Sequence, residues 1–290
     1  MGKRGEKGDR LKTKMDGLLG ESHCSEKHSD LLFHYTKAET ALAYILRSKR
    51  LKFGSLGDTN DPLENRPLTH LGTRNVPADK SGIPLAIEFK LPELRQERQK
   101  AKLACFCVTP NSNVPWKIRC YYDWGCYRSR MWSQYADNHK GVCLVFSKNE
   151  LLLAVREWGH GRMIEPFEDK IEYDNKLKAL ADAINVSQAE NPSDRIKARQ
   201  KGYYFCKRKD YEDESEYRMV VYHEAFETEG SVLIPYKNSL KGILLGTNLP
   251  REQNDLFIEE ALGSDLALAQ LEWDSNPHFV EVESCWLPHC

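Results

Sequence analysis

The stretch Lys209–Tyr222, K-D-Y-E-D-E-S-E-Y-R-M-V-V-Y, constrains the fold of this chain most. From Glu214 onward the pattern predicts a β-strand, in which successive side chains point to opposite faces. One face carries the apolar set Tyr217, Met219 and Val221. The other carries the polar set Glu214, Glu216 and Arg218, with the two carboxylates about 7 Å apart along the strand. Such a face can hold a carboxylate at a fixed position; the alternative is a solvated strand face with an ion pair.

The rest of the 290-residue chain mixes helical and strand patterns irregularly, with few clean strand–helix–strand units. This order predicts an α+β fold rather than a doubly wound parallel sheet. Residues 1–29 are rich in Gly, Lys and Glu without periodicity, which predicts a disordered basic arm. We expect residues 30–290 to form one domain.

A histidine and a tyrosine lie at a predicted strand–helix junction near the start of this domain. Leu31–Tyr35 is a short apolar run, and Thr36-Lys-Ala-Glu39 matches a capping box for a following helix. The free backbone N–H groups at such a helix start suit a phosphate, with His34, Tyr35 and Thr36 beside it. The alternative for His34 is a core histidine.

Rings gather in the middle of the sequence. Residues 109–128 form an aromatic-rich segment, and a helix is predicted over Ser129–Asn138. Met131, Trp132 and Tyr135 would share one face of that helix, which indicates either a core face or a ring set for a cofactor. A basic-aromatic string, Tyr203–Lys209, precedes the predicted strand.

Composition excludes several classes of protein. The net charge of −1 gives no global attraction to nucleic acid or to an anionic membrane. No apolar run approaches the roughly 20 residues of a membrane helix, and the start lacks the apolar core of a secretory signal. The nine cysteines are irregularly spaced, which favours reduced thiols and a cytoplasmic location.

Standard catalytic and metal motifs are absent. The sequence contains no P-loop, no G-x-G-x-x-G after a strand, no G-x-S-x-G and no H-E-x-x-H. Four cysteines and a histidine can be drawn together on zinc, but core thiols explain the C-x-C run better. These residues are Cys105, Cys107, Cys120, Cys126 and His139.

Three segments together resemble the bacterial family known as domain of unknown function 2971. They are Phe33-His-Tyr-Thr36 leading to Asn60-Asp-Pro62, then Met131-Trp-x-x-Tyr135-Ala with His139-x-Gly141, then Glu214-x-Glu216-Tyr-Arg218. The resemblance covers most of residues 31–285. More distantly, the layout is similar to the His–Tyr–Glu arrangement of the ADP-ribosyltransferase fold, which implies split mixed or antiparallel sheets with flanking helices.

This second resemblance implies roles for individual residues. His34 would hold the adenosine ribose of NAD, and Tyr135 or Tyr35 would stack on nicotinamide, with Trp132 one helical turn before Tyr135. Glu216 would hydrogen-bond the nicotinamide ribose. The resemblance implies ADP-ribosyl transfer to a protein or nucleic-acid acceptor, in bacterial defence or toxin action.

The residue types suit that chemistry. Loss of nicotinamide leaves a sugar with oxocarbenium character, which a fixed carboxylate stabilises. Glu214 could orient or deprotonate the acceptor, and Arg218 could keep the carboxylates ionised.

Two other functions stay open at this stage. The first is a nucleic-acid-binding or nucleic-acid-processing module, with phosphates on Lys207, Arg208 and Lys209 and bases stacked on Tyr203 and Tyr204. The second is a partner-binding domain without catalysis, because fold does not determine function.

Overall fold

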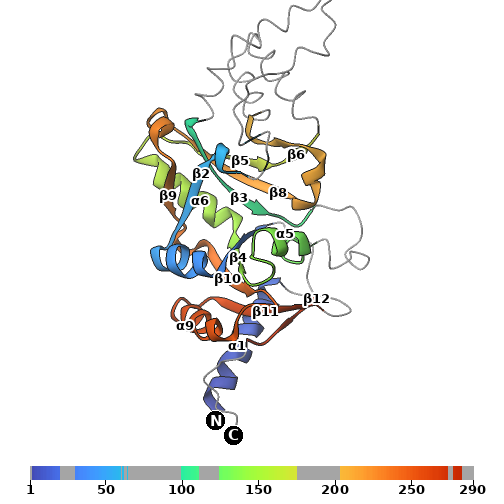
Figure 1. Cartoon of the computed structure of the whole chain (residues 1–290). Helices are drawn as coiled ribbons and strands as arrows, with labels where there is room; N and C mark the ends of the chain where they lie inside the picture. Colours follow the sequence, from blue (N-terminus) through green and yellow to red (C-terminus); the bar gives the residue numbers. More distant parts are fainter. Residues whose placement is uncertain are drawn as a thin grey trace, which may run out of the picture.

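The computed structural model describes residues 2–19, 30–59, 61, 64, 99–110, 124–174, 203–273 and 277–282. These residues form an open, mostly antiparallel sheet with several helices packed against it (Figure 1). The predicted α+β class is therefore confirmed. In the described ranges, no helix combines the length and the apolarity that crossing a bilayer requires.

The main sheet contains ten strands within the described ranges, and eight of them follow the order β12-β11-β10-β4-β1-β3-β2-β9. Strand β8 pairs with β3, and β5 pairs with β8. Strands β10 and β11 run parallel, and the other pairs of this sheet are antiparallel. The strands are β1 (Leu31–Thr36), β2 (Arg50–Ser55), β3 (Ala101–Cys107), β4 (Val142–Ser147), β5 (Phe167–Lys170), β8 (Glu216–Tyr222), β9 (Ser231–Pro235), β10 (Leu240–Leu245), β11 (Ala267–Trp273) and β12 (Pro277–Val280).

Two further strands, β6 (Glu172–Tyr173) and β7 (Cys206–Lys207), form a small parallel sheet. The α-helices are α1 (Gly2–Leu19), α2 (Ala38–Thr40), α5 (Ser129–Gln134), α6 (Lys148–His160) and α9 (Asn254–Gly263). Helix α2 continues into the π-helix η2 (Ala41–Leu46). The 3-10 helices are η3 (Leu56–Asp58), η8 (Lys209–Glu214), η9 (Glu224–Thr228), η10 (Lys237–Ser239) and η11 (Arg251–Gln253).

The main sheet divides at β3. One edge of β3 pairs with β8 over its full length. Its other edge is shared, since Leu103 pairs with Gly54 of β2 and Cys107 pairs with Phe33 of β1. Strands β2 and β9 therefore separate from β1 at this point, while β8 and β5 continue the sheet beyond β3.

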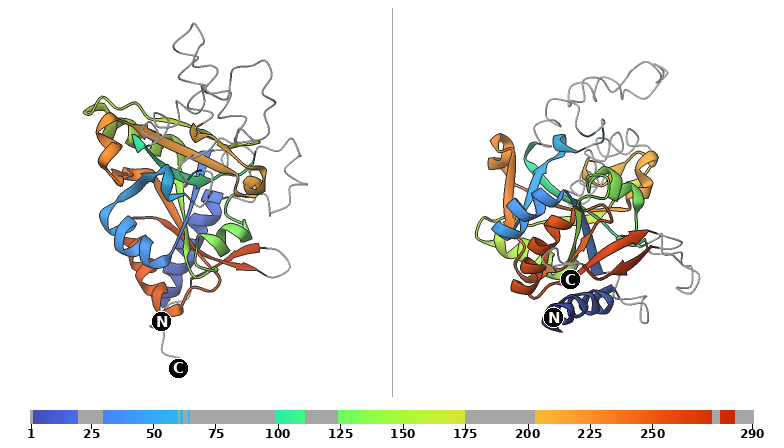
Figure 2. Two further views of the ribbon diagram at one scale, coloured as in Figure 1. Left: turned by 45° about the horizontal axis from the view of Figure 1, so that its top comes forward. Right: turned by 60° about the horizontal axis from the view of Figure 1, so that its bottom comes forward.

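Alternation along the strands builds a separate core on each face of the sheet. One core contains the predicted apolar set of β8, Tyr217, Met219 and Val221, packed with side chains from α6, η2 and α9. The opposite core contains Phe33, Tyr35 and Trp132, covered by α1 and α5 (Figures 1 and 2). The apolar assignment for β8 is thus confirmed.

The N-terminal residues differ from the prediction of a disordered arm. Residues 2–19 form helix α1, which contacts β10, β11, β12 and α9. Leu11, Met15 and Leu19 recur every four residues and are buried, so one stripe of the helix lies on the sheet. The prediction of disorder was based on composition, in which the many lysines outweigh the few apolar residues of this stripe. Residues 20–29 lie outside the described ranges.

Gly141, directly before β4, permits the close approach of two backbone segments. A Cβ atom there would lie 2.3 Å from the carbonyl oxygen of Thr36 and 2.9 Å from Cα of Ala136. Because backbone must move to relieve such contacts, we expect Gly141→Ala to lower the free energy of unfolding by about 1–3 kcal/mol. Urea denaturation measures this change.

Gly161 supplies the matched control for that substitution. Its φ is −68°, and a Cβ atom there would have no neighbour within 4 Å. We expect Gly161→Ala to stabilise the protein by about 0.4–1 kcal/mol, because alanine restricts the unfolded chain. Equal effects of the two substitutions would contradict the close packing at Gly141.

Candidate functional site

The strand that carries the predicted carboxylates begins later than expected. Glu214 is the last residue of η8, and Ser215 adopts a left-handed conformation with φ of 42°. Strand β8 starts only at Glu216. The prediction that Glu214 lies on the same strand as Glu216 and Arg218 was therefore wrong, because a left-handed residue interrupts the extended chain.

The two carboxylates nevertheless meet at one cation. The Nζ atom of Lys207 lies 2.8 Å from Oε2 of Glu214 and 2.6 Å from Oε2 of Glu216. Lys207 belongs to β7, so three short elements converge on this ammonium group. The turn at Ser215 redirects the chain between the two glutamates so that both reach Lys207.

Arg218 joins Glu216 to a third carboxylate. Its Nε atom donates to Oε1 of Glu216 at 2.5 Å. Its two terminal nitrogens donate to the two oxygens of Glu64, each at 2.8 Å, which is the bidentate geometry that guanidinium favours. One of these nitrogens also donates to the carbonyl oxygen of Tyr204. We call Glu64, Lys207, Glu214, Glu216 and Arg218 the charge cluster.

The charge cluster is removed from water. Each of its residues is at most 5 % exposed, and Arg218 is fully buried. Burial raises the pKa of Glu216, but the charges of Arg218 and Lys207 outweigh it and hold this pKa below its ordinary value. Burial likewise opposes the charge of Lys207, yet Glu216 and Glu214 raise the pKa of Lys207. The three carboxylates and two cations leave one net negative charge.

Helix α5 brings Tyr135 to this cluster. The helix begins at Ser129 as predicted but ends at Gln134 rather than Asn138, and Tyr135 follows directly. The hydroxyl group of Tyr135 donates to Oε1 of Glu214 at 2.9 Å. Arg130 binds η8 through the side chain of Asp213 and the carbonyl oxygen of Asp210, which fixes α5 beside the start of β8 (Figure 1).

The two thiols of the C-x-C run face the charge cluster from β3. The sulfhydryl of Cys107 donates to the carbonyl oxygen of Glu214 at 2.9 Å. Burial raises the pKa of Cys107 to about 12, and burial and the charge of Glu216 raise that of Cys105. Both thiols therefore stay protonated at neutral pH and are poor nucleophiles.

The structure does not bring His34 to this site. Cys107 pairs with both Phe33 and Glu216, and directly paired residues of antiparallel strands share a face. His34 follows Phe33 and therefore points to the opposite face. There its ring lies 5.7 Å from that of Phe106, and its Nδ1 lies 3.1 Å from the carbonyl oxygen of Cys105. Burial lowers the pKa of His34.

The other predicted cofactor-binding residues are core residues, except Tyr135. Tyr35 lies on the Glu216 face, but its hydroxyl donates to the carbonyl oxygen of Gly125 and its ring packs on Trp132 at 5.2 Å. The indole of Trp132 donates to the carbonyl oxygen of Cys126. Thr36 ends β1 and pairs with Val142. The helix starts after Lys37 without a side-chain cap, so the predicted capping box was wrong.

The basic-aromatic string does not form an exposed patch. Tyr203 and Tyr204 are buried, and the ammonium of Lys207 is held within the charge cluster. Only Arg208 and Lys209 of the predicted phosphate-binding residues are exposed. The aromatic residues Trp116, Tyr121 and Tyr122, as well as Asn60 and Pro62, lie outside the described ranges.

The sequence did not predict that two residues, Lys207 and Glu64, belong to the charge cluster. Lys207 lies in a K-R-K run, which is typical of a solvated turn. Glu64 follows the Asn60-Asp-Pro62 segment by two residues in the sequence. Its place beside a recognised segment was the one signal that could have identified it.

The arrangement can stabilise positive charge. Its carboxylates are fixed by cations and hydrogen bonds, and one negative charge stays uncompensated among the five cluster residues. Tyr135 is partly exposed and contacts Glu214, so its ring connects the cluster with the surface. Such preorganised charge acts where a cation develops during a reaction.

Comparison with known proteins gives one match. Residues 131–219 match the model of a family described as protein of unknown function (DUF2971). This segment runs from α5 to β8 and contains Tyr135, Lys207, Glu214, Glu216 and Arg218. No curated protein and no solved structure matches the chain.

Proposed function

We propose that this chain, which belongs to the DUF2971 family, transfers the ADP-ribosyl group of NAD to a protein or nucleic-acid acceptor. The observation that supports the proposal is the contact of Tyr135 with Glu214 beside Glu216. Two segments that are far apart in the sequence supply these residues. The cleaved bond would be the C–N bond between nicotinamide and C1′ of its ribose.

Each group has a role in this proposal. Nicotinamide leaves with the bonding electron pair, and the net negative charge at Glu214 and Glu216 stabilises the cationic ribose. The ring of Tyr135 lies against the pyridinium ring. Glu214 accepts the proton of the acceptor as the new bond to C1′ forms. His34 has no part in this version, because it lies on the other face of the sheet.

The test measures transfer of label from NAD labelled on its adenosine to protein and to RNA and DNA. We expect Glu214→Gln and Glu216→Gln each to reduce transfer at least about 100-fold, the lower range for loss of a general base. Glu212→Gln is the matched control, because Glu212 lies on the same short helix and is exposed. Full transfer by the Glu214 and Glu216 variants would refute the proposed roles.

Binding is tested separately from transfer. NAD at 100 times its Kd should stabilise the wild-type protein by about 2.7 kcal/mol, because it binds only the folded state. If NAD does not raise the Tm and no label is transferred, the proposal as a whole is refuted.

A second candidate function follows from a specific observation. Every carboxylate of the charge cluster is already bound to a cation, and Arg218 is fully buried. The cluster can therefore serve to hold β7, η8 and β8 together in a partner-binding domain that has no catalytic activity. Absence of NAD binding together with strong destabilisation by loss of Arg218 would favour this function.

A further inference from the structure

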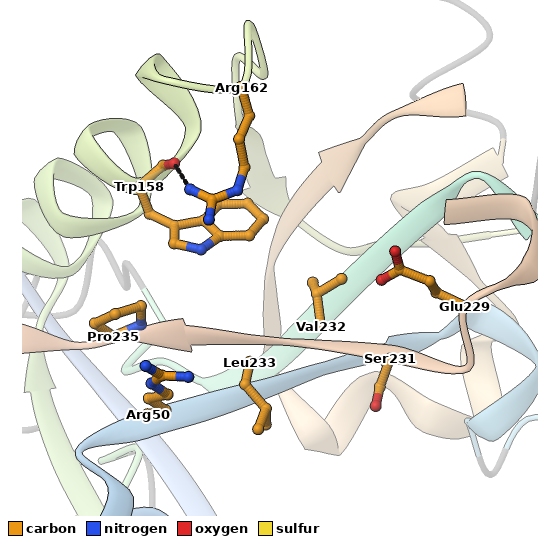
Figure 3. A pocket seen from close by; sticks show the side chains of 8 residues that line it. All are labelled: Arg50, Trp158, Arg162, Glu229, Ser231, Val232, Leu233 and Pro235. Carbon is orange, nitrogen blue, oxygen red and sulfur yellow. Dashed lines mark hydrogen bonds between the residues drawn. The ribbon is translucent and has the colours of Figure 1, made fainter. Parts of the chain in front are cut away.

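A groove of about 510 Å³ lies along β9 (Figure 3). None of the residues that line it belongs to the charge cluster. Figure 3 shows Val232, Trp158 and Arg162 on one side of the strand and Leu233, Ser231 and Arg50 on the other. The groove therefore flanks the strand on both sides. A ligand that lies along β9 can contact both sets of side chains.

Strand β9 is an edge of the sheet. Within the described ranges it pairs only with β2. The N–H of Tyr236 donates to the carbonyl oxygen of Lys49, so the backbone of residues 232 and 234 points toward β2 in the same way. The backbone of Ser231 and Leu233 then points outward, together with the carbonyl of Pro235.

The side chains of this edge are unusual for an unpaired strand. Natural edges are blunted by charges or proline, since an open apolar edge invites pairing with another chain. Here Pro235 closes one end only, and Leu233 is 51 % exposed in the middle of the strand. The outward backbone groups beside it can accept another extended segment.

Two of the three charged side chains that line the groove are cationic, Arg50 and Arg162. Neither Arg50 nor Arg162 makes an ion pair with a carboxylate in the part of the chain that the structure describes. The guanidinium of Arg162 lies 4.6 Å from the ring centroid of Trp158 and donates to its carbonyl oxygen, which holds the charge in place. Glu229 is the one acidic side chain among the lining residues.

We propose that β9 binds an acidic peptide of another protein in extended conformation, as an added strand. The main chain of the peptide pairs with Ser231 and Leu233, and alternate side chains point to the two sides of β9. Carboxylates reach Arg162 on one side and Arg50 on the other, while an apolar side chain covers Leu233. This inference does not depend on the proposed ADP-ribosyl transfer.

The test uses a fluorescein-labelled peptide that repeats Glu-Glu-Val-Val, which as a strand presents carboxylates and valines on both faces, with a Lys-Lys-Val-Val peptide of equal length for comparison. Fluorescence anisotropy should show that the protein binds the acidic peptide and does not bind the Lys peptide. We expect Arg50→Glu and Arg162→Glu each to weaken this binding about tenfold or more, since a like charge then faces the ligand. Arg156→Glu is the control, because Arg156 lies on the same helix as Trp158 but pairs with Glu165 outside the groove.

A backbone variant tests the pairing itself. Leu233→Pro removes an outward N–H without removing a hydrogen bond to β2, and should weaken peptide binding about tenfold. Circular dichroism checks that this variant folds. If it does not fold, the Arg50→Glu and Arg162→Glu variants alone decide whether β9 binds the peptide.

Three results would overturn the proposal. They are no binding of the acidic peptide at about 1 mM, binding that is the same in the Arg50 and Arg162 variants, and equal binding of the Lys peptide. A dimer seen by sedimentation, and lost in Leu233→Pro, would instead show that β9 pairs with a second copy of the chain. Label transfer from NAD should be the same in all these variants.

Discussion

Replacing Arg218 by methionine is expected to lower the free energy of unfolding by about 3–5 kcal/mol, the usual cost of leaving a buried charge without its partner. Arg218 is fully buried and binds Glu216 and both oxygens of Glu64. Methionine fills much of the same space but offers no positive charge, so Glu64 loses both of the hydrogen bonds described above. Urea denaturation at neutral pH measures the change.

Arg208→Met is the matched control for this prediction. Arg208 pairs with Asp210 at 2.8 Å, but both side chains are about half exposed to water. We expect a change of about 0–1 kcal/mol, because water screens such a pair. A loss at Arg218 no larger than that at Arg208 would show that the buried network contributes little to stability.

Replacing Lys207 by methionine should have a similarly large effect, with a different dependence on pH. Lys207 is the cation that Glu214 and Glu216 share. Without it, Glu214 loses its cation and Glu216 keeps only Arg218, so we expect a loss of about 3–5 kcal/mol at neutral pH. The exposed Lys209 gives the control Lys209→Met, which should leave stability almost unchanged.

The sign of the pH dependence distinguishes Lys207→Met from the wild type. In the wild type the pKa of Glu216 is lowered despite burial, so its contribution to stability is present above the unfolded pKa of about 4.3 and is lost as the pH falls. In Lys207→Met, burial and like charge raise a carboxyl pKa above that value. The folded variant then binds an extra proton, and its stability should decrease as the pH rises. Parallel pH profiles would contradict this account.

Local pattern was sufficient to predict one part of the site. The alternation of Tyr217, Met219 and Val221 identified the core face of β8, because a strand offers only two faces. The same pattern misplaced Glu214, because Ser215 is left-handed although it is neither glycine nor asparagine. Contacts with the rest of the fold, such as the bond from the N–H of Val108 to the carbonyl oxygen of Ser215, hold that conformation.

Contacts between distant segments decided the rest. Whether His34 faces Glu216 depends on how β1, β3 and β8 align, and shifting one strand by one residue would exchange the faces. The burial of Lys207 depends on carboxylates from two other elements. A run of basic residues carries no sign of such partners, so the sequence suggested a surface patch.

The shared ammonium of Lys207 and the forked contact of Arg218 restrict how this protein can diverge. Substitution of either cation by a neutral residue leaves a buried carboxylate without its positive partner. A tolerated change therefore requires a second substitution at position 64, 214 or 216. Sequences that descend from this one should therefore keep all five residues of the charge cluster or lose them as a group, whereas exposed residues around the cluster can vary independently.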